Sequence, residues 1–395
     1  MKDDLPKGFR AATVAAKFRN WNRDDLGLIF SDLPCVLAAL FTRNIFCAAP
    51  VIVCKEILAS GRTIRAVVAN AGQANSCTGA DGLKDCREIQ EIAAKDLGVA
   101  PDEIALVSTG VIGARFDMAK WREALKKLSA GLGKQDAEGF TRSFMTTDAF
   151  PKFASRDIEL SAGNVRLTVM AKGAGMICPD MATMLCVVLT DAAITREYWR
   201  KFFIKEVDAS FNRVSVDGDT STNDTILGLA NGASGVELIS DGDRELFRDE
   251  LGQILKKVAY MLVQDGEGSS KVIHIDIEGA ADEAAAKKAA RAVAGSQLVK
   301  TAIYGGDANW GRIINAVGYS GVDVRPDEVG LYLCGIERFR DGVPVNDNME
   351  AELAEKLKER DISVRIILGK GDGKYSMLSS DLGREYVTLN SDYRS

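Results

Sequence analysis

The sequence is poor in the residues that most often carry enzyme chemistry. It has one histidine, His274, and its eight cysteines form no C-x-x-C pair. Zinc sites draw on histidine and cysteine, so a zinc centre is not expected, and a Ser-His-Asp triad would depend on His274 alone. In residues 271–278 isoleucines alternate with polar residues. This pattern predicts a strand with His274 on its polar face, in a structural or solvated role.

Long apolar runs and an excess of basic residues are also absent. The longest apolar stretches, such as residues 34–41, are too short to cross a bilayer. The N-terminus carries acids where a signal peptide has a basic start. The net charge of −6 argues against a nucleic-acid or membrane partner. We therefore expect a cytoplasmic protein whose cysteines stay reduced and pack as small hydrophobic side chains.

The periodicity of the sequence indicates a mixed α/β (α+β) fold. Hydrophobic residues make up 46% and charged residues 27% of the 395 residues, which is sufficient for a sizeable core. Apolar and alternating runs predict strands within residues 8–53, 65–70, 103–107, 165–170, 184–189, 271–278, 329–334 and 364–368. Amphipathic runs predict helices at residues 84–97, 118–129, 195–207, 243–263, 280–299 and 349–360.

One stretch, KGAGMICPDMATML at residues 172–185, joins two predicted strands. Its two glycines, its proline and its aspartate predict a sharp bend. The bend would present Thr183 as the first residue of the outgoing strand. Threonine is common in strands, so this position alone does not identify a nucleophile.

Several loops are rich in small polar residues. STGVIG at residues 108–113 ends a predicted strand with hydroxyls and glycines, an arrangement that suits an anion or oxyanion site. Residues 70–79 fit either a ligand loop or an ordinary strand-to-helix connection. Residues 215–225 fit either a hydrogen-bonded pocket wall or a solvated surface loop, and their lack of lysine favours the pocket wall.

These motifs together resemble the ornithine acetyltransferase family, the glutamate N-acetyltransferases of arginine biosynthesis. The resemblance covers the whole chain and rests on several motifs in order: STGVIG at 108–113, KGAGM at 172–176, MATML at 181–185, GGDANWGR at 305–312 and NSDY at 390–393. It implies a two-domain α/β body of packed sheets covered by helix layers, of the self-processing N-terminal-threonine type. It also implies a cut between Ala182 and Thr183.

The resemblance also implies the chain organisation and the residue roles. Residues 1–182 would form an α chain and residues 183–395 a β chain, intertwined in one body and assembled as an α2β2 heterotetramer. Thr183 would be the nucleophile, and Thr109 and Gly110 would stabilise the oxyanion. The substrate-binding positions would be Thr146, Lys172, Thr183, Glu267, Asn390 and Ser395.

Two positions depart from the commonest family pattern. Asp180 stands where asparagine is expected, and it adds a negative charge close to the cleavage loop. Ser395 stands where threonine is usual, and the serine keeps the hydroxyl group.

The implied chemistry suits a chain with so little histidine. A threonine hydroxyl needs a base, and a cut before Thr183 would supply one as an α-amino group with a pKa near 8. The implied reaction moves acetyl from N2-acetylornithine to glutamate through an acetyl-threonine. The partners are these small molecules; no metal or cofactor is implied, and acetyl-CoA remains open as a second donor.

Two other functions remain open from the residues. A self-processing amidase or aminopeptidase of related fold would release its product without an acceptor. A small-molecule binding protein with glycine-rich loops would stay a single unbroken chain.

Overall fold

The chain folds into two compact units. The computed structural model describes residues 4–178, 184–345 and 348–392. The first unit contains the chain up to residue 212 together with residues 219–262, and the second contains residues 213–218 and the chain from 263 to 393. The predicted cleavage point, with Asp180, Ala182 and Thr183, lies outside the described residues, as does Ser395.

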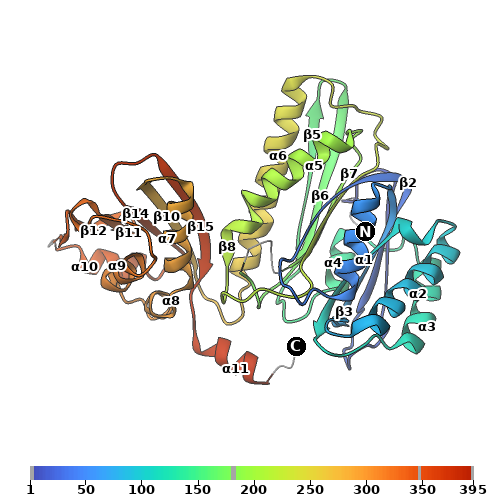
Figure 1. The fold of residues 1–395 in the computed structure, drawn as a ribbon, viewed down its shortest axis with the longest axis horizontal. Helices are drawn as coiled ribbons and strands as arrows, with labels where there is room; N and C mark the ends of the chain where they lie inside the picture. The colour runs from blue at the N-terminus through green and yellow to red at the C-terminus, as the bar shows by residue number, and fades with distance from the viewer. Residues whose placement is uncertain (1–3, 179–183, 346–347, 393–395) are drawn as a thin grey trace. The chain divides into compact units, whose positions relative to one another are not determined.

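The first unit is built on a mixed eight-stranded sheet (Figure 1). Its strand order is β4-β3-β2-β9-β7-β6-β5, and β1 pairs with β2 beside this path. The strands are β1 (Phe9–Val14), β2 (Leu26–Phe41), β3 (Ile64–Gln73), β4 (Ile104–Val111), β5 (Lys152–Leu160), β6 (Gly163–Lys172), β7 (Leu185–Thr190) and β9 (Thr225–Ala230).

The long strand β2 connects the two halves of this sheet. Its first part pairs with β1 and β3, and its residues from Val36 to Phe41 pair with β9. The register with β3 shifts between Phe30 and Cys35, where an irregularity interrupts the ladder. One apolar core contains residues of both halves, among them Val67 of β3 and Val187 of β7. The ends of β4 and β6 are in contact through Thr109 and Lys172, although the two strands belong to different halves of the sheet.

Six helices cover the described strands of the first unit. They are α1 (Ala49–Ser60), α2 (Gly79–Leu97), α3 (Met118–Ala130), α4 (Ala137–Ser143), α5 (Arg196–Asp208) and α6 (Asp241–Gln264). Helix α1 packs against β4 and β2, and α5 packs against β2. The largest fully buried side chains include Trp121 of α3 and Trp199 of α5.

Helix α1 corrects the prediction that strands continue to residue 53. Its residues are β-branched and apolar, which resembles a buried strand in the sequence. Pro50 stands in the first turn, where its missing N–H removes no helical hydrogen bond. Gly61 ends the helix with a φ of 68°. Burial of Val51, Val53 and Ile57 in the core supplies the rest of the stabilisation.

The second unit is a seven-stranded sheet with helices beside it (Figure 1). The strand order is β13-β12-β11-β14-β10-β15-β8. The strands are β8 (Val214–Ser215), β10 (Val272–Ala280), β11 (Gly330–Leu333), β12 (Ile336–Arg340), β13 (Val343–Pro344), β14 (Asp361–Ile367) and β15 (Gly373–Ser380). The helices are α7 (Glu283–Gly295), α8 (Gln297–Tyr304), α9 (Trp310–Gly318), α10 (Glu350–Lys356) and α11 (Arg384–Asp392).

The helix predicted across residues 280–299 is in fact two helices. Ser296 interrupts it, and its hydroxyl accepts a hydrogen bond from the N–H of Val299 to cap α8. The predicted strand of His274 is confirmed as β10. The Nε2 of His274 lies 2.7 Å from Oδ1 of Asp361 on the neighbouring strand β14. Within the part of the chain that the structure describes, no helix has the length and apolar character needed to cross a membrane.

Candidate functional site

The stretch with the predicted cleavage point connects two central strands of the first sheet. Lys172 at the end of β6 pairs with Leu185 at the start of β7. Leu185 also pairs with Thr225, the first residue of the parallel strand β9. The N–H of Thr225 donates to the carbonyl of Met184, 3.0 Å away. The chain therefore re-enters the sheet beside the end of the polar run 215–225.

Two predicted site residues from different strands are in contact. The Nζ of Lys172 donates a hydrogen bond of 3.2 Å to the Oγ of Thr109, at the end of β4. Lys172 is only 9% exposed, while Thr109 and Gly110 are half-buried. Sixty-three positions separate the two residues in the chain. The fold thus places an ammonium group against the hydroxyl for which the family resemblance implies oxyanion stabilisation.

Gly110 occupies a position that only glycine fits. Its φ is 137°, a conformation that other L-residues rarely adopt. A Cβ on this residue would lie 2.2 Å from the backbone carbonyl carbon of Gly72 on β3. The missing side chain therefore lets β4 approach β3 closely, which fixes the backbone that follows Thr109.

The described part of the cleavage loop adopts uncommon backbone conformations. Gly173 has a φ of 148° and Met176 a φ of 56°. Left-handed backbone at a residue with a side chain costs about 1 kcal/mol. Ile177 forms an isolated antiparallel bridge with Thr220, whose hydroxyl donates to the carbonyl of Cys178 at 3.2 Å. The loop is therefore bent and held from the side by the polar run.

The end of the polar run 215–225 is buried and supports the site through hydrogen bonds, whereas Gly218 and Asp219 are exposed as in a surface loop. Asn223 is 6% exposed, and its Nδ2 donates to the carbonyl oxygens of Ala74 at 2.7 Å and Ser108 at 2.9 Å. Ser108 directly precedes Thr109. The hydroxyl of Thr222 completes the arrangement by donating to the Oδ1 of Asn223 at 2.7 Å. The sequence indicates the run through its small polar residues, but it does not single out Asn223.

Thr146 lines a cavity of about 420 Å³ in the first unit. Arg23 and Arg142 line the same cavity. The side chain of Arg23 donates to the backbone carbonyls of Arg142 and Met145, which precedes Thr146. The N–H of Thr146 itself donates to Oδ2 of Asp148 at 2.9 Å. This predicted substrate position therefore lies on an accessible hollow with a fixed backbone.

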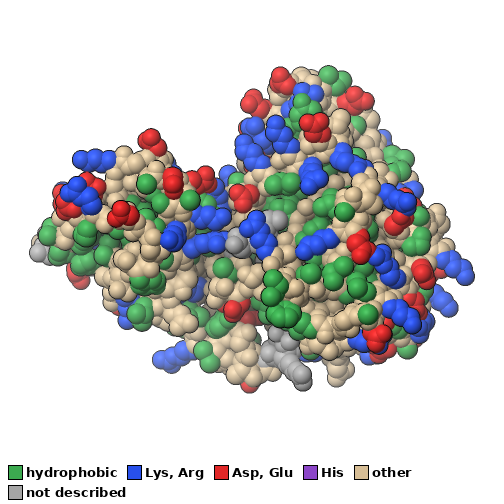
Figure 2. All heavy atoms as spheres, in the orientation of Figure 1, with side chains coloured by type: hydrophobic (Ala, Val, Ile, Leu, Met, Phe, Trp, Pro, Cys, Tyr) green, Lys and Arg blue, Asp and Glu red, His purple; other side chains and the backbone are tan. Residues whose placement is uncertain are grey.

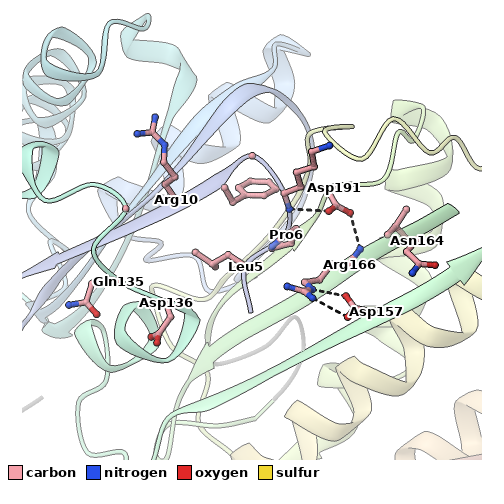
Figure 3. Close-up of a pocket in the computed structure, with 14 residues that line it drawn as sticks. Leu5, Pro6, Arg10, Gln135, Asp136, Asp157, Asn164, Arg166 and Asp191 are labelled. Atoms are coloured by element: carbon pink, nitrogen blue, oxygen red, sulfur yellow. Dashed lines mark hydrogen bonds and ion pairs between the residues drawn. The ribbon is translucent and has the colours of Figure 1, made fainter. Parts of the chain in front are cut away.

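A second cavity of the first unit, of about 570 Å³, is shown in Figure 3. It lies at the opposite ends of β6 and β7, where Arg166 and Asp191 line it. Arg166 is paired with Asp157 at 2.6 Å, so its charge is already matched. None of the predicted site residues within the described ranges lines this cavity.

Two predicted substrate residues meet within the second unit. The Nδ2 of Asn390 on α11 donates to Oε2 of Glu267 at 2.8 Å. Gly268, next to Glu267, has a φ of 67°, and a Cβ there would lie 2.5 Å from the backbone nitrogen of Tyr386. The glycine therefore lets α11 pack closely on the Glu267 loop.

The surface in view carries both signs of charge. Figure 2 shows basic and acidic side chains interspersed, with apolar patches among them. Among the described residues, no group of three or more His, Cys, Asp or Glu side chains is arranged to hold a metal ion.

The two sheets with their helices define a mixed α/β protein, and the hydroxyl–ammonium contact at the ends of β4 and β6 marks its candidate active site. The ArgJ family model matches residues 10–395. The chain therefore belongs to the ArgJ family.

Two curated relatives match this chain over nearly its whole length. The arginine biosynthesis bifunctional protein ArgJ of Nitratidesulfovibrio vulgaris is 53% identical, with 99% of each chain covered. The protein of the same name from Geobacter sulfurreducens is 44% identical, with 98% of this chain and 99% of the relative covered. A crystal structure of ArgJ from Bacillus halodurans is 36% identical with a TM-score of 0.49, and the match covers 51% of this chain and 96% of that one.

Proposed function

We propose that the chain cleaves itself between Ala182 and Thr183 and that Thr183 then carries the acetyl group. Membership of the ArgJ family makes the chain an acetyltransferase of arginine biosynthesis, which moves acetyl from N2-acetylornithine to glutamate. The covalent route and the residue roles are the proposed part. The main observation in support of this route and these roles is the contact between Lys172 and Thr109. It lies at the end of β6, one of the two strands that flank the predicted cut.

Self-cleavage proceeds as an acyl shift followed by hydrolysis. The Oγ of Thr183 attacks the carbonyl carbon of Ala182, the C–N bond breaks, and the freed amine takes the hydroxyl proton. Water then hydrolyses the ester and leaves a carboxylate on Ala182 and a hydroxyl on Thr183. The left-handed backbone of Met176 supports this route, because a cut in the loop can relieve such strain.

Acetyl transfer uses the same hydroxyl, now with the α-amine of Thr183 as its base. The Oγ attacks the acetyl carbonyl of N2-acetylornithine, the amide bond breaks, and ornithine leaves with the proton. The amine of glutamate then attacks the acetyl-threonine ester. N-acetylglutamate departs, and the hydroxyl of Thr183 is restored.

Thr109 and Gly110 stabilise the oxyanion in this proposal. A threonine hydroxyl has one hydrogen to donate and two lone pairs that accept. Because Lys172 donates to the Oγ of Thr109, the hydroxyl hydrogen points elsewhere and is available to an acyl oxygen. The close approach at Gly110 holds the adjacent backbone in place. One such donor contributes about 3 kcal/mol to the transition state.

Charge suggests how the substrates bind. Both substrates carry an α-carboxylate, and the positive charge of Lys172 would attract such a group. Glu267 suits the cationic end of ornithine, with Thr146, Asn390 and Ser395 as further substrate contacts.

We further propose that the two products stay together in an α2β2 heterotetramer. Strands β7 and β9 of the C-terminal product lie between β2 and β6 of the N-terminal product. The ladders on both sides would hold the products in one sheet after the cut.

Intact mass spectrometry of Thr183→Ala and Thr183→Ser tests the proposal. The wild type and the serine variant should each give two chains, one ending at residue 182 and the other beginning at residue 183. The alanine variant should give one uncut chain that has no acetyl-transfer activity. An alanine variant that still splits at this bond would contradict the mechanism.

A separate activity assay tests the transfer reaction. With N-acetylornithine and glutamate, the wild type should form N-acetylglutamate; release of free acetate instead would favour the amidase function. Supplying acetyl-CoA and glutamate alone tests the second donor.

A further inference from the structure

We propose that Asp148 is a positioning residue that fixes the entry of the cleavage loop relative to the turn that carries Thr146. The inference deepens the proposed function and rests on self-cleavage at Thr183. The family resemblance implies a substrate-binding role for Thr146 but gives Asp148 no role.

The carboxylate of Asp148 holds two backbone segments at once. Its Oδ1 accepts the N–H of Gly173, the first residue after β6, at 2.7 Å. Its Oδ2 accepts the N–H of Thr146 at 2.9 Å. Gly173 is also the loop residue with a φ of 148°. One side chain therefore fixes where the loop leaves the sheet and where the Thr146 turn lies.

A buried lysine balances the charge of this carboxylate. The Nζ of Lys152 lies 2.6 Å from Oδ1 of Asp148, and both side chains are 0% exposed. The same Nζ donates to the carbonyl of Phe150 at 3.3 Å. Burial alone would raise the pKa of Asp148, but the ammonium groups of Lys152 and Lys172 and the hydrogen bonds outweigh it and lower the pKa to about 2. The carboxylate is thus an ionised acceptor throughout the working pH range, and Lys172 lies in its field.

The geometry limits what can replace this carboxylate. An aspartate offers two acceptor oxygens, whereas asparagine offers one oxygen and an NH₂ group that cannot accept. With asparagine at this position, an N–H of either Thr146 or Gly173 would face another donor. The loop would then lose one of its two attachments to the turn.

Asp191, the residue that follows β7, provides a control carboxylate in the same sheet. It lies at the opposite end of β6, about 20 Å from Lys172 along the strand. Its two oxygens accept the backbone N–H groups of Arg166 at 2.8 Å and Lys7 at 3.0 Å, as Figure 3 shows. Asp191 is 6% exposed. Like Asp148, it accepts two backbone N–H groups from separate segments, but these segments lie away from the cleavage loop.

The experiment follows the cut in the full chain after cell-free synthesis is stopped. The fraction of uncut precursor is measured over time on denaturing gels, and the thermal midpoint of each product is measured separately. The double variant D148N/K152M removes both buried charges at nearly constant volume. D148N alone, in which Lys152 can still bond the amide oxygen, serves if the double variant does not fold.

Loss of one charge-assisted hydrogen bond predicts that D148N/K152M is cut about ten- to a hundredfold more slowly than wild type. D191N should lower the thermal midpoint and be cut at the wild-type rate. The inference is overturned if the Asp148 variants are cut as fast as wild type, or if D191N slows the cut equally. A wild-type chain that stays whole overturns the proposed function, and this inference with it.

Discussion

The ammonium of Lys172 lies 3.2 Å from the hydroxyl oxygen of Thr109 and donates to it. This direction of donation decides what the hydroxyl can offer a ligand. An oxygen that accepts from an ammonium is polarised, and its own hydrogen becomes a better donor. Lys172 therefore acts on the proposed oxyanion position through Thr109, in addition to its direct attraction for a carboxylate.

Replacing Lys172 by methionine should lower kcat/KM for N-acetylornithine by about tenfold, because the hydroxyl of Thr109 loses its polarising partner. Thr109→Val, which removes the hydroxyl, should cost about 100- to 1,000-fold. Because part of the effect of Lys172 passes through Thr109, adding Lys172→Met to Thr109→Val should cost less than Lys172→Met costs in the wild type. Steady-state kinetics of the two single variants and the double variant measure this coupling. Fully additive effects would show that Lys172 acts independently of Thr109.

Alanine at Gly110 should abolish most transfer activity. The added Cβ would lie 2.2 Å from the backbone of Gly72, and the φ of 137° would be strained as well. We expect a loss in kcat/KM of about 100-fold or more, since the oxyanion backbone must move. Gly98 is a matched control: its φ is 68° and no atom lies within 4 Å of a Cβ there. Gly98→Ala should cost about 1 kcal/mol of stability and leave kcat unchanged.

Asn223→Ala tests the support of the strand that carries Thr109. It removes the donor to the carbonyls of Ala74 and Ser108, so kcat should fall about tenfold and stability by about 1–3 kcal/mol. Asn231, at the other end of β9, likewise donates to the carbonyl of Lys7 at 3.0 Å and the hydroxyl of Ser31 at 3.1 Å. Asn231→Ala should lose similar stability in urea unfolding but keep its kcat. Equal losses of kcat in both variants would assign Asn223 a purely structural role.

The sequence predicts the residues at the candidate site better than it predicts the buried residues that support them. Thr109, Gly110 and Lys172 stand in recognisable motifs at the ends of apolar strands, so their position at strand ends follows from the pattern. The buried ion pair of Lys152 and Asp148 cannot be predicted in this way. Lysine side chains are ordinarily exposed, and this pair is recognisable only in the folded structure.

The two errors in secondary structure have different origins. Helix α1 is rich in apolar and β-branched residues, and it is helical because Pro50 suits its first turn and the core buries its face. The division between α7 and α8 is local, because the hydroxyl of Ser296 accepts the N–H of Val299 and caps α8. Burial in the core overrides the local preference at α1, whereas at α8 the sequence does carry the capping signal.

The acid stability of the chain should depend on Asp148. Its pKa is lowered from 3.8 to about 2, so its charge stabilises the fold fully above about pH 4, and this contribution is lost as the pH falls towards 2. The contribution is about 2 kcal/mol. Urea unfolding at pH 5 and pH 2.5 should therefore show a smaller acid-induced loss in D148N/K152M than in wild type, by about two-thirds of that amount.

Asp25 provides a control of opposite sign. Burial raises its pKa, so it favours the fold below its unfolded pKa and the benefit is lost as the pH rises through the folded pKa. Asp25→Asn should therefore make the acid-induced loss of stability larger than in wild type, the reverse of the effect at Asp148.

One outcome would contradict the prediction for Asp148. If the stability of wild type and of D148N/K152M falls in parallel between pH 5 and pH 2.5, then Lys152 and Lys172 do not hold the carboxylate of Asp148 ionised.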